Sequence, residues 1–468
     1  MRIAGHELRF LFVRELLAAD RLDSRRVLRR AAGRAAGARG RGMGEGAGEG
    51  VETHRMRIVI INSLYTPHII GGAEISTQIL AEALTEAADV HVLTLGGQKR
   101  KAGTVTERIR GVTVHRLPYA GLYWIGEGKK RSLAARTLRR LSDLYNPVQI
   151  GAVKERLETI RPDVIHTQNL SGFGAAVWTA GESLGIPIAH TLRDYSLLSP
   201  VSSPLANRAL AKLYSLTSAG FSRKVSAVVG ISTHILKRHT NAGLFPAAES
   251  RVIPNAVDGD IVAAERIGAH RPLRIGCFGR VEPEKGVREF VEAALPLPPD
   301  AVEQVVVCGE GSLLEELRTL CRDDPRFVFP GKVKPEEARA LMADMDANFV
   351  PSIWEEPFGR VIIESYQVGT PVYASAVGGI PDAVWSPDEF LFRPGSAVAI
   401  RAKIMEFCDK TAEERRLLQE QCIRHCRKFT QASLLESHLE LYGGLLAGRR
   451  EWPANVVITG GHRVRAGE

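Results

Sequence analysis

The sequence predicts an α/β protein with two Rossmann-like domains, each a doubly wound parallel sheet, that face a shared cleft. Its 468 residues are too many for one ordinary core and fit two domains. A strand, a glycine-rich loop, a helix and a further strand follow one another from Arg57, and a second series of the same kind begins at Leu273. Hydrophobic residues make up 44% and charged residues 25%, as in globular proteins, and we expect no membrane span.

The first lobe is predicted over residues 56–255. Its expected elements are a strand at 57–62, a loop at 67–72, a helix at 73–87, strands at 89–94, 162–166, 186–190 and 226–230, and a helix near 172–184. Between about 119 and 160 the pattern is weaker. We interpret the basic residues of that stretch, which include Arg136, Arg139 and Arg140, as a solvated helical face.

The second lobe is predicted over residues 273–425, after a linker at 256–272. Its strands are expected at 273–278, 302–308, 327–329, 347–350 and 371–374. A C-terminal helix at 426–448 is expected to pack back toward the first lobe, followed by a tail at 449–468. Facing lobes bring the carboxyl ends of both sheets and the positive ends of their helices to one cleft, which suits a diphosphate.

Residues 1–55 form a basic extension that ends in a glycine-rich run, which we interpret as a flexible linker. The net charge of +9 and the isoelectric point near 9.3 do not choose among phosphorylated substrates, nucleic acid and an anionic membrane face. Residues 3–30 have an apolar helical side opposite their arginines, so one hypothesis is a basic helix lying on an anionic bilayer. The other is a solvated, partly disordered tail.

The expected location is cytoplasmic, with peripheral contact to the membrane as an open alternative. Further arginines follow Arg25 and Arg26, where a twin-arginine export signal needs an apolar region. All six cysteines lie between Cys277 and Cys426, which does not fit a disulfide framework and favours a reducing compartment. A zinc site at Cys422 and Cys426 would need more ligands from elsewhere, so we expect no metal.

Two cations flank one predicted loop of the second lobe. The segment 279–286 directly follows a buried strand, so Arg280 and Lys285 are expected at the carboxyl end of that strand. A planar guanidinium and a compact ammonium together suit the oxygens of a pyrophosphate. The competing interpretation is two cations on a solvent-exposed loop.

Residues 351–364 carry the strongest signal for a ligand. A loop leads into a helix that is predicted to begin near Gly359, and the first amides of this helix, from about Phe358 to Ile362, can receive a phosphate. The sequence therefore predicts a second anion-binding element in the same lobe.

Two carboxylates bracket this predicted helix start. Glu356 precedes the helix and Glu364 lies more than one turn inside it, so one can accept hydroxyls from a sugar and the other from a ribose. The alternative is that Glu356 interacts only with the helix dipole and Glu364 faces solvent.

Taken together, these segments resemble the family 4 glycosyltransferases of the GT-B fold. The matching motifs of the second lobe are Phe278-Gly279-Arg280 with Lys285-Gly286, Val307-Cys308-Gly309-Glu310-Gly311, Glu356-Pro357-Phe358-Gly359 with Glu364, Gly369-Thr370-Pro371-Val372 and Val377-Gly378-Gly379-Ile380-Pro381. The first lobe adds Tyr65-Thr66-Pro67, Gly71-Gly72-Ala73-Glu74, Val252-Ile253-Pro254-Asn255-Ala256-Val257-Asp258 and the segment around Asp194.

The resemblance implies a retaining, metal-independent transfer. It implies that Arg280 and Lys285 hold the donor diphosphate, that Glu364 holds the ribose and that Glu356 holds the sugar. It also implies that Gly71 and Gly72 make room for donor and acceptor, and that Glu310, Phe358, Gly359 and Val361 complete the donor site.

The acceptor side departs from the family pattern. In many relatives a His-Asp pair follows the strand at 186–190, whereas here Arg193 occupies the expected histidine position and His190 lies three residues earlier. We predict Arg193 and Asp194 as the catalytic pair, with His190 as the alternative to it and Glu356 as the remaining candidate for a nucleophile.

The predicted function is transfer of a sugar from a UDP-, GDP- or ADP-sugar to a hydroxyl acceptor, in glycan, polysaccharide or glycolipid synthesis. No further cofactor and no nucleic-acid partner are expected, and a lipid-linked glycan is one candidate acceptor. Asp344-Met345-Asp346 resembles a metal-binding Asp-x-Asp but precedes a strand, and Leu314 stands where a dinucleotide motif needs its third glycine. A GT-B epimerase, a phosphorylase or a silent binding module remain alternatives.

Overall fold

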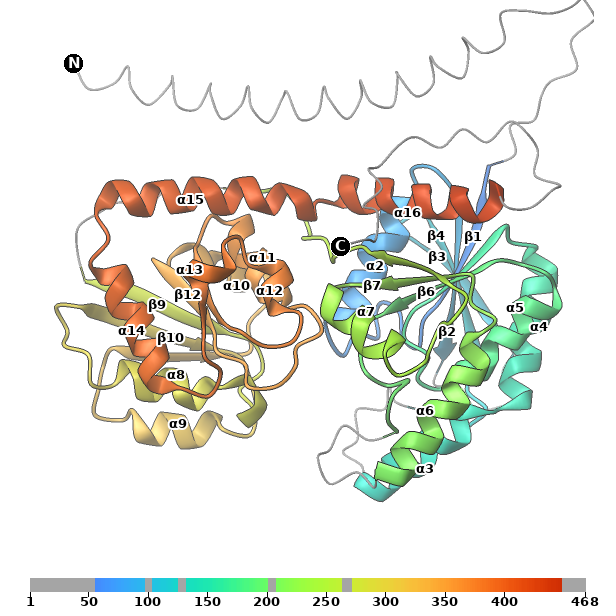
Figure 1. The fold of residues 1–468 in the computed structure, drawn as a ribbon, viewed down its shortest axis with the longest axis horizontal. Coiled ribbons are helices and arrows are strands. Elements are labelled where there is room, and N and C mark those ends of the chain that lie inside the picture. The colour runs from blue at the N-terminus through green and yellow to red at the C-terminus, as the bar shows by residue number, and fades with distance from the viewer. Residues whose placement is uncertain (1–54, 97–102, 125–131, 201–207, 263–271, 448–468) are drawn as a thin grey trace, which may run out of the picture.

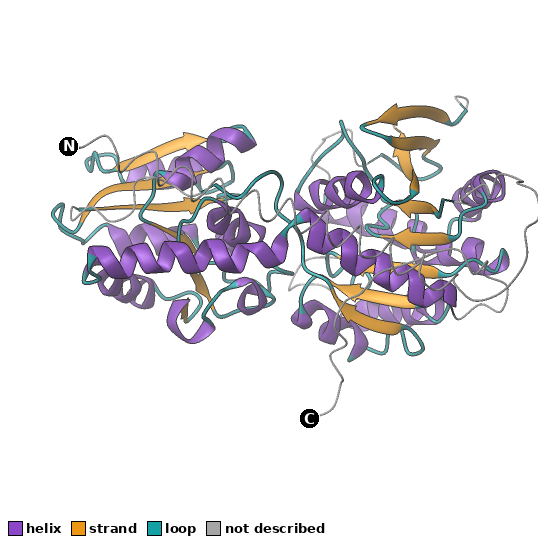
Figure 2. Cartoon of the chain, turned by 90° about the horizontal axis from the view of Figure 1, so that it is seen from above, coloured by secondary structure: helices purple, strands orange, loops and turns teal. Residues whose placement is uncertain are grey.

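The computed structural model describes residues 55–96, 103–124, 132–200, 208–262 and 272–447, and it confirms the two α/β lobes (Figure 1). Residues 3–30, for which a helix on the membrane surface was one of two hypotheses, and the tail at 449–468 lie outside the described residues. Figure 2 shows the lobes side by side, each with helices packed around its own sheet. No described helix has the length and apolar character needed to cross a bilayer.

Lobe one is built on an eight-stranded sheet in the order β3-β4-β2-β1-β5-β6-β7-β8. The strands are β1 (Arg57–Ile61), β2 (Asp89–Gly96), β3 (Val105–Ile109), β4 (Val112–Pro118), β5 (Val164–Thr167), β6 (Ile188–Leu192), β7 (Ala227–Gly230) and β8 (Glu249–Val252). The helices are α2 (Gly72–Leu84), α3 (Leu133–Leu144), α4 (Pro147–Ile160), α5 (Trp178–Ser183), α6 (Arg208–Ser222) and α7 (Thr233–Thr240). All pairings are parallel except β3 with β4, an antiparallel hairpin at one edge.

Lobe two is built on a six-stranded, wholly parallel sheet in the order β11-β10-β9-β12-β13-β14. The strands are β9 (Leu273–Phe278), β10 (Val302–Cys308), β11 (Phe327–Gly331), β12 (Ala347–Val350), β13 (Val372–Ser375) and β14 (Leu391–Phe392). The helices are α8 (Val287–Ala294), α9 (Leu314–Leu320), α10 (Pro335–Ala343), α11 (Arg360–Gln367), α12 (Ile380–Ala383), α13 (Pro387–Phe390), α14 (Ala397–Cys408) and α15 (Ala412–Cys426). β9 and β12 are central, so the loops that follow them reach the middle of the cleft.

The chain returns to lobe one through its last described helix, α16 (Gln431–Ala447), which packs on α2 (Figure 1). A hydrogen bond of 2.6 Å joins the Tyr442 hydroxyl to Nδ1 of the buried His166 on β5. Leu434, Leu441 and Leu446 enter the same apolar cluster as β1 and α2. The C-terminal segment therefore ties lobe two to lobe one.

Two segments considered for metal binding make contacts within lobe two. The Asp346 carboxylate accepts the backbone amide of Arg274 at 2.8 Å, and Asp344 forms an ion pair of 2.6 Å with the Arg274 guanidinium. Cys422 and Cys426 are buried free thiols of α15, and Cys426 donates to the carbonyl of Ile363 on α11. These groups hold strand β9 and helix α11 in place.

Candidate active site

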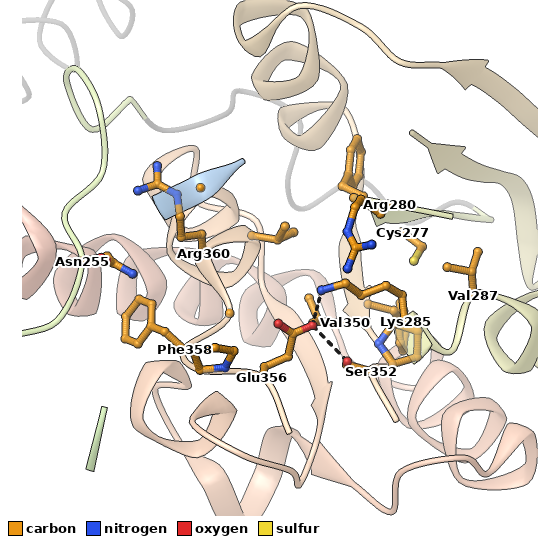
Figure 3. A pocket seen from close by; sticks show the side chains of 18 of the residues that line it. Asn255, Cys277, Arg280, Lys285, Val287, Val350, Ser352, Glu356, Phe358 and Arg360 are labelled. Carbon is orange, nitrogen blue, oxygen red and sulfur yellow. Dashed lines mark hydrogen bonds and ion pairs between the residues drawn. The ribbon is translucent and has the colours of Figure 1, made fainter. Parts of the chain in front are cut away.

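A cavity of about 260 Å³ lies between the lobes, at the carboxyl ends of β9 and β12 (Figure 3). From lobe one it is lined by Gly72, Ala73, Ser76, Arg193, Ile231 and Asn255. From lobe two come the end of β9, the loop with Arg280 and Lys285, and two pieces of the segment after β12, Val350 to Ser352 and Glu356 to Val361. Both lobes therefore contribute to one site.

Two helices begin at this cavity. α11 starts at Arg360, after Gly359 in the left-handed conformation with φ +95°. α2 starts at Gly72, and both Gly72 and Ala73 line the cavity. Because the first amides of a helix have no partner inside the helix and carry its positive dipole end, both starts favour a negatively charged ligand.

Close approach of the two helices depends on Gly72. A Cβ added there would lie 2.9 Å from Cδ of Arg360 on the other lobe. Such contacts are shorter than normal van der Waals separation, so a side chain at this position would push Arg360 aside.

The charged side chains of the cavity are mostly cationic. Among the described residues that line it, Arg193, Arg280, Lys285 and Arg360 are cations, and Glu356 is the one carboxylate. In a site partly shielded from water, this excess of positive charge and the two helix starts favour an anion with several charged oxygens.

Glu356 and Lys285 form an ion pair at the floor of the cavity (Figure 3). The Lys285 ammonium donates to Oε1 of Glu356, and the Ser352 hydroxyl donates to the same oxygen at 3.0 Å. The Glu356 side chain is largely buried, so the pair fixes its carboxylate. Lys285 and Glu356, both predicted as site residues, are therefore in direct contact. Ser352, which was not predicted as a site residue, is a second partner of Glu356.

Arg280 lies closer to solvent than Lys285. Its guanidinium reaches Glu284 at 3.2 Å, and 61% of its side chain is exposed. It still lines the cavity beside Lys285. Because exposed ion pairs are weak, Arg280 is free to exchange this partner for a ligand oxygen.

Arg360 connects the two lobes and was missed as a site residue. Its guanidinium donates to the Ser76 hydroxyl of α2 at 2.7 Å and to Oε1 of Glu364 at 2.9 Å. A cation at the first position of a helix opposes the helix dipole, so it needs acceptors of this kind. Glu364 itself does not line the cavity, but its side chain is 28% exposed and pairs with Arg360, which does line it.

Arg193 reaches the cavity from the loop after β6. It donates to Oε1 of Gln168 and, at 2.6 Å, to Oδ1 of Asn255. Burial, followed by the charge of Arg360, lowers the pKa of Arg193 to about 9, so it remains a cation at neutral pH. Its neighbour Asp194 does not line the cavity and accepts the Ser196 amide at 2.8 Å.

His190 lies inside lobe one and does not line the cavity. Its Nδ1 is 2.9 Å from the Thr167 hydroxyl, and its ring packs against Trp178 and Phe245. Burial lowers its pKa to about 3, so the imidazole is neutral at physiological pH. The arrangement brings Arg193 to the cleft and leaves His190 in the core.

Of the remaining predicted site residues, some line the cavity and others do not. Phe358, Gly359 and Val361 line the cavity, whereas Gly71 and Glu310 do not. Gly71 caps α2 by donating its amide to Oε2 of Glu74 at 2.8 Å. Glu310 is exposed, and its carbonyl accepts the amide of Val281 at 2.9 Å.

Comparison with known proteins decides the family. The Glycosyl transferase 4-like domain matches residues 71–256, and Glycosyl transferases group 1 matches residues 272–410. An uncharacterized 42.6 kDa protein in the cps region of Klebsiella pneumoniae is 32% identical over 339 residues, which are 70% of this chain and 87% of that protein. The chain belongs to the family 4 glycosyltransferases of the GT-B fold.

Solved structures share the architecture of this glycosyltransferase. Sucrose-phosphate synthase from Thermosynechococcus elongatus superposes with a TM-score of 0.65 at 22% identity, over 84% of this chain and 100% of that one. HepE from Anabaena in complex with UDP-glucose superposes with a TM-score of 0.60 at 18% identity, over 83% and 100% of the two chains. The family makes this chain an enzyme that transfers sugars.

Proposed function

We propose that this glycosyltransferase moves a sugar from a nucleoside diphosphate sugar to a hydroxyl acceptor, with retention and without a metal ion. The observation that carries the proposal is the convergence of four cations and two helix N-termini on one interlobe cavity. A diphosphate brings a charge that this arrangement complements. Of the possible donors, a UDP-sugar is the first to test, since the similar HepE structure contains UDP-glucose.

In the proposed mechanism, Lys285, Arg280 and the first amides of α11 bind the two phosphates. Their charge stabilises the negative charge that develops as the nucleoside diphosphate leaves, which is the contribution a metal ion makes elsewhere. Glu356, fixed by Lys285 and Ser352, accepts hydroxyls of the donor sugar. Glu364 and Arg360 together bind the ribose.

Retention follows if the acceptor attacks from the face that the diphosphate leaves. The acceptor oxygen forms the new bond to the anomeric carbon while the bond to the diphosphate breaks, and the departing phosphate takes the acceptor proton. This route needs no separate strong base. Arg193 lies on the lobe-one side of the cavity, where it can stabilise the leaving phosphate or the donor sugar.

The acceptor is proposed to be a growing glycan, polysaccharide or glycolipid, and the reaction to take place on the cytoplasmic side. A donor screen tests the core of the proposal. The protein is heated with UDP-, GDP- and ADP-sugars, and a donor at 100 times its dissociation constant adds about 2.7 kcal/mol to stability. If no nucleotide sugar shifts the melting temperature or releases a nucleoside diphosphate, the proposal is wrong.

Glu364→Gln is expected to weaken binding of the donor without stopping catalysis. The Glu364 carboxylate accepts hydrogen bonds from Arg360 and, as proposed, from the ribose. Loss of its charge reduces the binding free energy of the donor by about 1.5–3 kcal/mol, so KM for the donor rises about tenfold or more while kcat changes less. Steady-state release of the nucleoside diphosphate measures both constants. Glu420→Gln, which breaks an exposed i, i+4 pair with Arg416 on α15, is the control and leaves both unchanged.

A further inference from the structure

Helix α3 of lobe one directs its ion pair inward and its leucines toward solvent. The Arg139 guanidinium pairs with the Asp143 carboxylate at 2.8 Å, and the two residues are only 4% and 3% exposed. On the other side, Leu138 is 59% exposed and Tyr145, at the end of the helix, is 63% exposed. A surface helix normally does the reverse, so this solvent-facing side is suited to apolar contact.

The exposed apolar residues of α3 form one stripe. Ala134, Leu138, Leu141 and Tyr145 are exposed and follow one another at spacings of four, three and four residues. Residues at these spacings lie above one another on one side of a helix. The stripe is therefore continuous along the full length of α3.

Helix α6 adds a second exposed apolar stripe. Leu213 and Leu216 are 64% and 58% exposed, whereas Tyr214 on the same helix is buried. The rings of Tyr145 and Phe221 stack at 6.5 Å, which places the end of α3 against α6. Figure 1 shows the two helices together at the end of lobe one that lies away from α16.

The charge around these stripes is positive. Lys212 is exposed on α6 beside Leu213 and Leu216, and Arg223, directly after α6 and seven residues beyond Leu216, is exposed as well. Over the described residues, α6 contains no Asp or Glu, and the single acid of α3 is Asp143, whose carboxylate is buried against Arg139. The two helices thus present leucines and cations to solvent with no exposed carboxylate.

We propose that this apolar and basic face, defined by Leu138, Leu141, Tyr145, Leu213 and Leu216 with Lys212 and Arg223, docks on an anionic lipid bilayer. Acyl chains take up the leucines, and lipid phosphates bind the cations. A second copy of the chain is a poorer occupant, because a twofold contact would place the same cations opposite one another.

The docking face is linked through a series of contacts to the acceptor side of the cleft. The Tyr119 hydroxyl donates to Asp143 of α3 at 2.6 Å, and the loop after Tyr119 carries Trp124, which packs on His68 at 5.0 Å. His68 is followed by the exposed Ile70, two residues before the start of α2 at Gly72. Docking would therefore hold the lobe-one side of the cavity near the membrane, and the inference does not require the proposed reaction.

A site-specific label tests the docking face in the full-length chain. Five of the six cysteines are buried and the sixth is partly buried, so Leu138→Cys can be labelled selectively with an environment-sensitive fluorophore. On vesicles of equal parts phosphatidylglycerol and phosphatidylcholine, the emission is expected to shift to the blue, and 1 M salt is expected to weaken the shift. Leu417→Cys, exposed on α15 of lobe two, is the matched position and is expected not to shift.

The paired substitution Leu138→Glu with Leu213→Glu measures the contribution of the face to binding. Its vesicle partition coefficient is expected to fall at least about tenfold, while Leu417→Glu binds like the unmodified protein. Melting temperature and donor-dependent diphosphate release stay unchanged in both variants, because all three leucines are exposed and none of them lines the cavity. An unshifted label at position 138, or a shift that depends on protein concentration without vesicles, overturns the proposal.

Discussion

Replacing Lys285 with alanine is expected to reduce the rate of sugar transfer by about 10²–10³-fold. The Lys285 ammonium lies in the cavity at the end of β9, where a leaving diphosphate would gain negative charge. Loss of one well-placed electrostatic contact to a transition state has an effect of this size. The expected fall is therefore in kcat, measured as nucleoside diphosphate released per enzyme with saturating donor.

Two controls separate this role from general effects of a lost ion pair. Lys410→Ala removes another partly buried lysine that is paired with a carboxylate, that of Glu389, away from the cavity, and it should keep its activity. Arg280→Ala removes the more exposed cation of the same loop and should have a smaller effect than Lys285→Ala. Near-normal turnover in Lys285→Ala would contradict the proposed diphosphate site.

Lys285→Ala also leaves the Glu356 carboxylate without its cation, and this second effect can be measured. Ser352 would be its remaining described side-chain partner at Oε1. Comparing Lys285→Ala, Glu356→Gln and the double variant gives the coupling between the two residues. If Lys285 acts only by holding Glu356, the double variant is no slower than Glu356→Gln alone; direct action on the diphosphate makes it slower.

Most of the fold could be predicted from the sequence because its central strands are apolar runs. β1, β9 and β10 are buried almost throughout, and each precedes a glycine-containing turn. The hairpin of β3 and β4 was missed, since β3 is largely exposed and has no apolar pattern to reveal it. Edge strands are specified by pairing with a neighbour, which a local pattern does not report.

Part of the candidate site could also be predicted, because several of its residues follow these apolar strands. Lys285, Glu356 and Gly359 lie on loops that immediately follow buried strands, so their position in the cleft follows from the topology of a parallel sheet. The contact of Arg360 with Ser76 joins residues of different lobes. No local pattern encodes it, although the i, i+4 spacing of Arg360 and Glu364 was a usable signal for that pair.

The sequence around β6 did not decide whether His190 or Arg193 reaches the cleft. His190 and Arg193 are three residues apart, and the sequence alone left both as candidates. Burial separates them, because His190 is on β6 inside the core while Arg193 lies on the loop beyond its end. Which residue leaves the strand depends on where β6 ends, and strand ends are poorly defined by sequence.

Gly286→Ala is expected to lower the free energy of unfolding by roughly 2–5 kcal/mol and to impair transfer by about tenfold or more. Gly286 has φ +68°, and an added Cβ would lie 1.9 Å from the carbonyl oxygen of Pro351. The backbone after β12 must then move away from the loop after β9. That movement separates Glu356 from Lys285, whose contact requires both loops in register.

Gly331→Ala is the matched control, because it shares the backbone strain without the clash. Gly331 has φ +76°, and apart from its chain neighbours an added Cβ would meet no described atom within 4 Å. A left-handed alanine is destabilising by about 1–2 kcal/mol, so this variant should lose some stability and keep its turnover. Thermal unfolding and diphosphate release measured on both variants separate the two contributions. Equal losses of activity would mean that contact between the two cleft loops does not position Lys285 and Glu356.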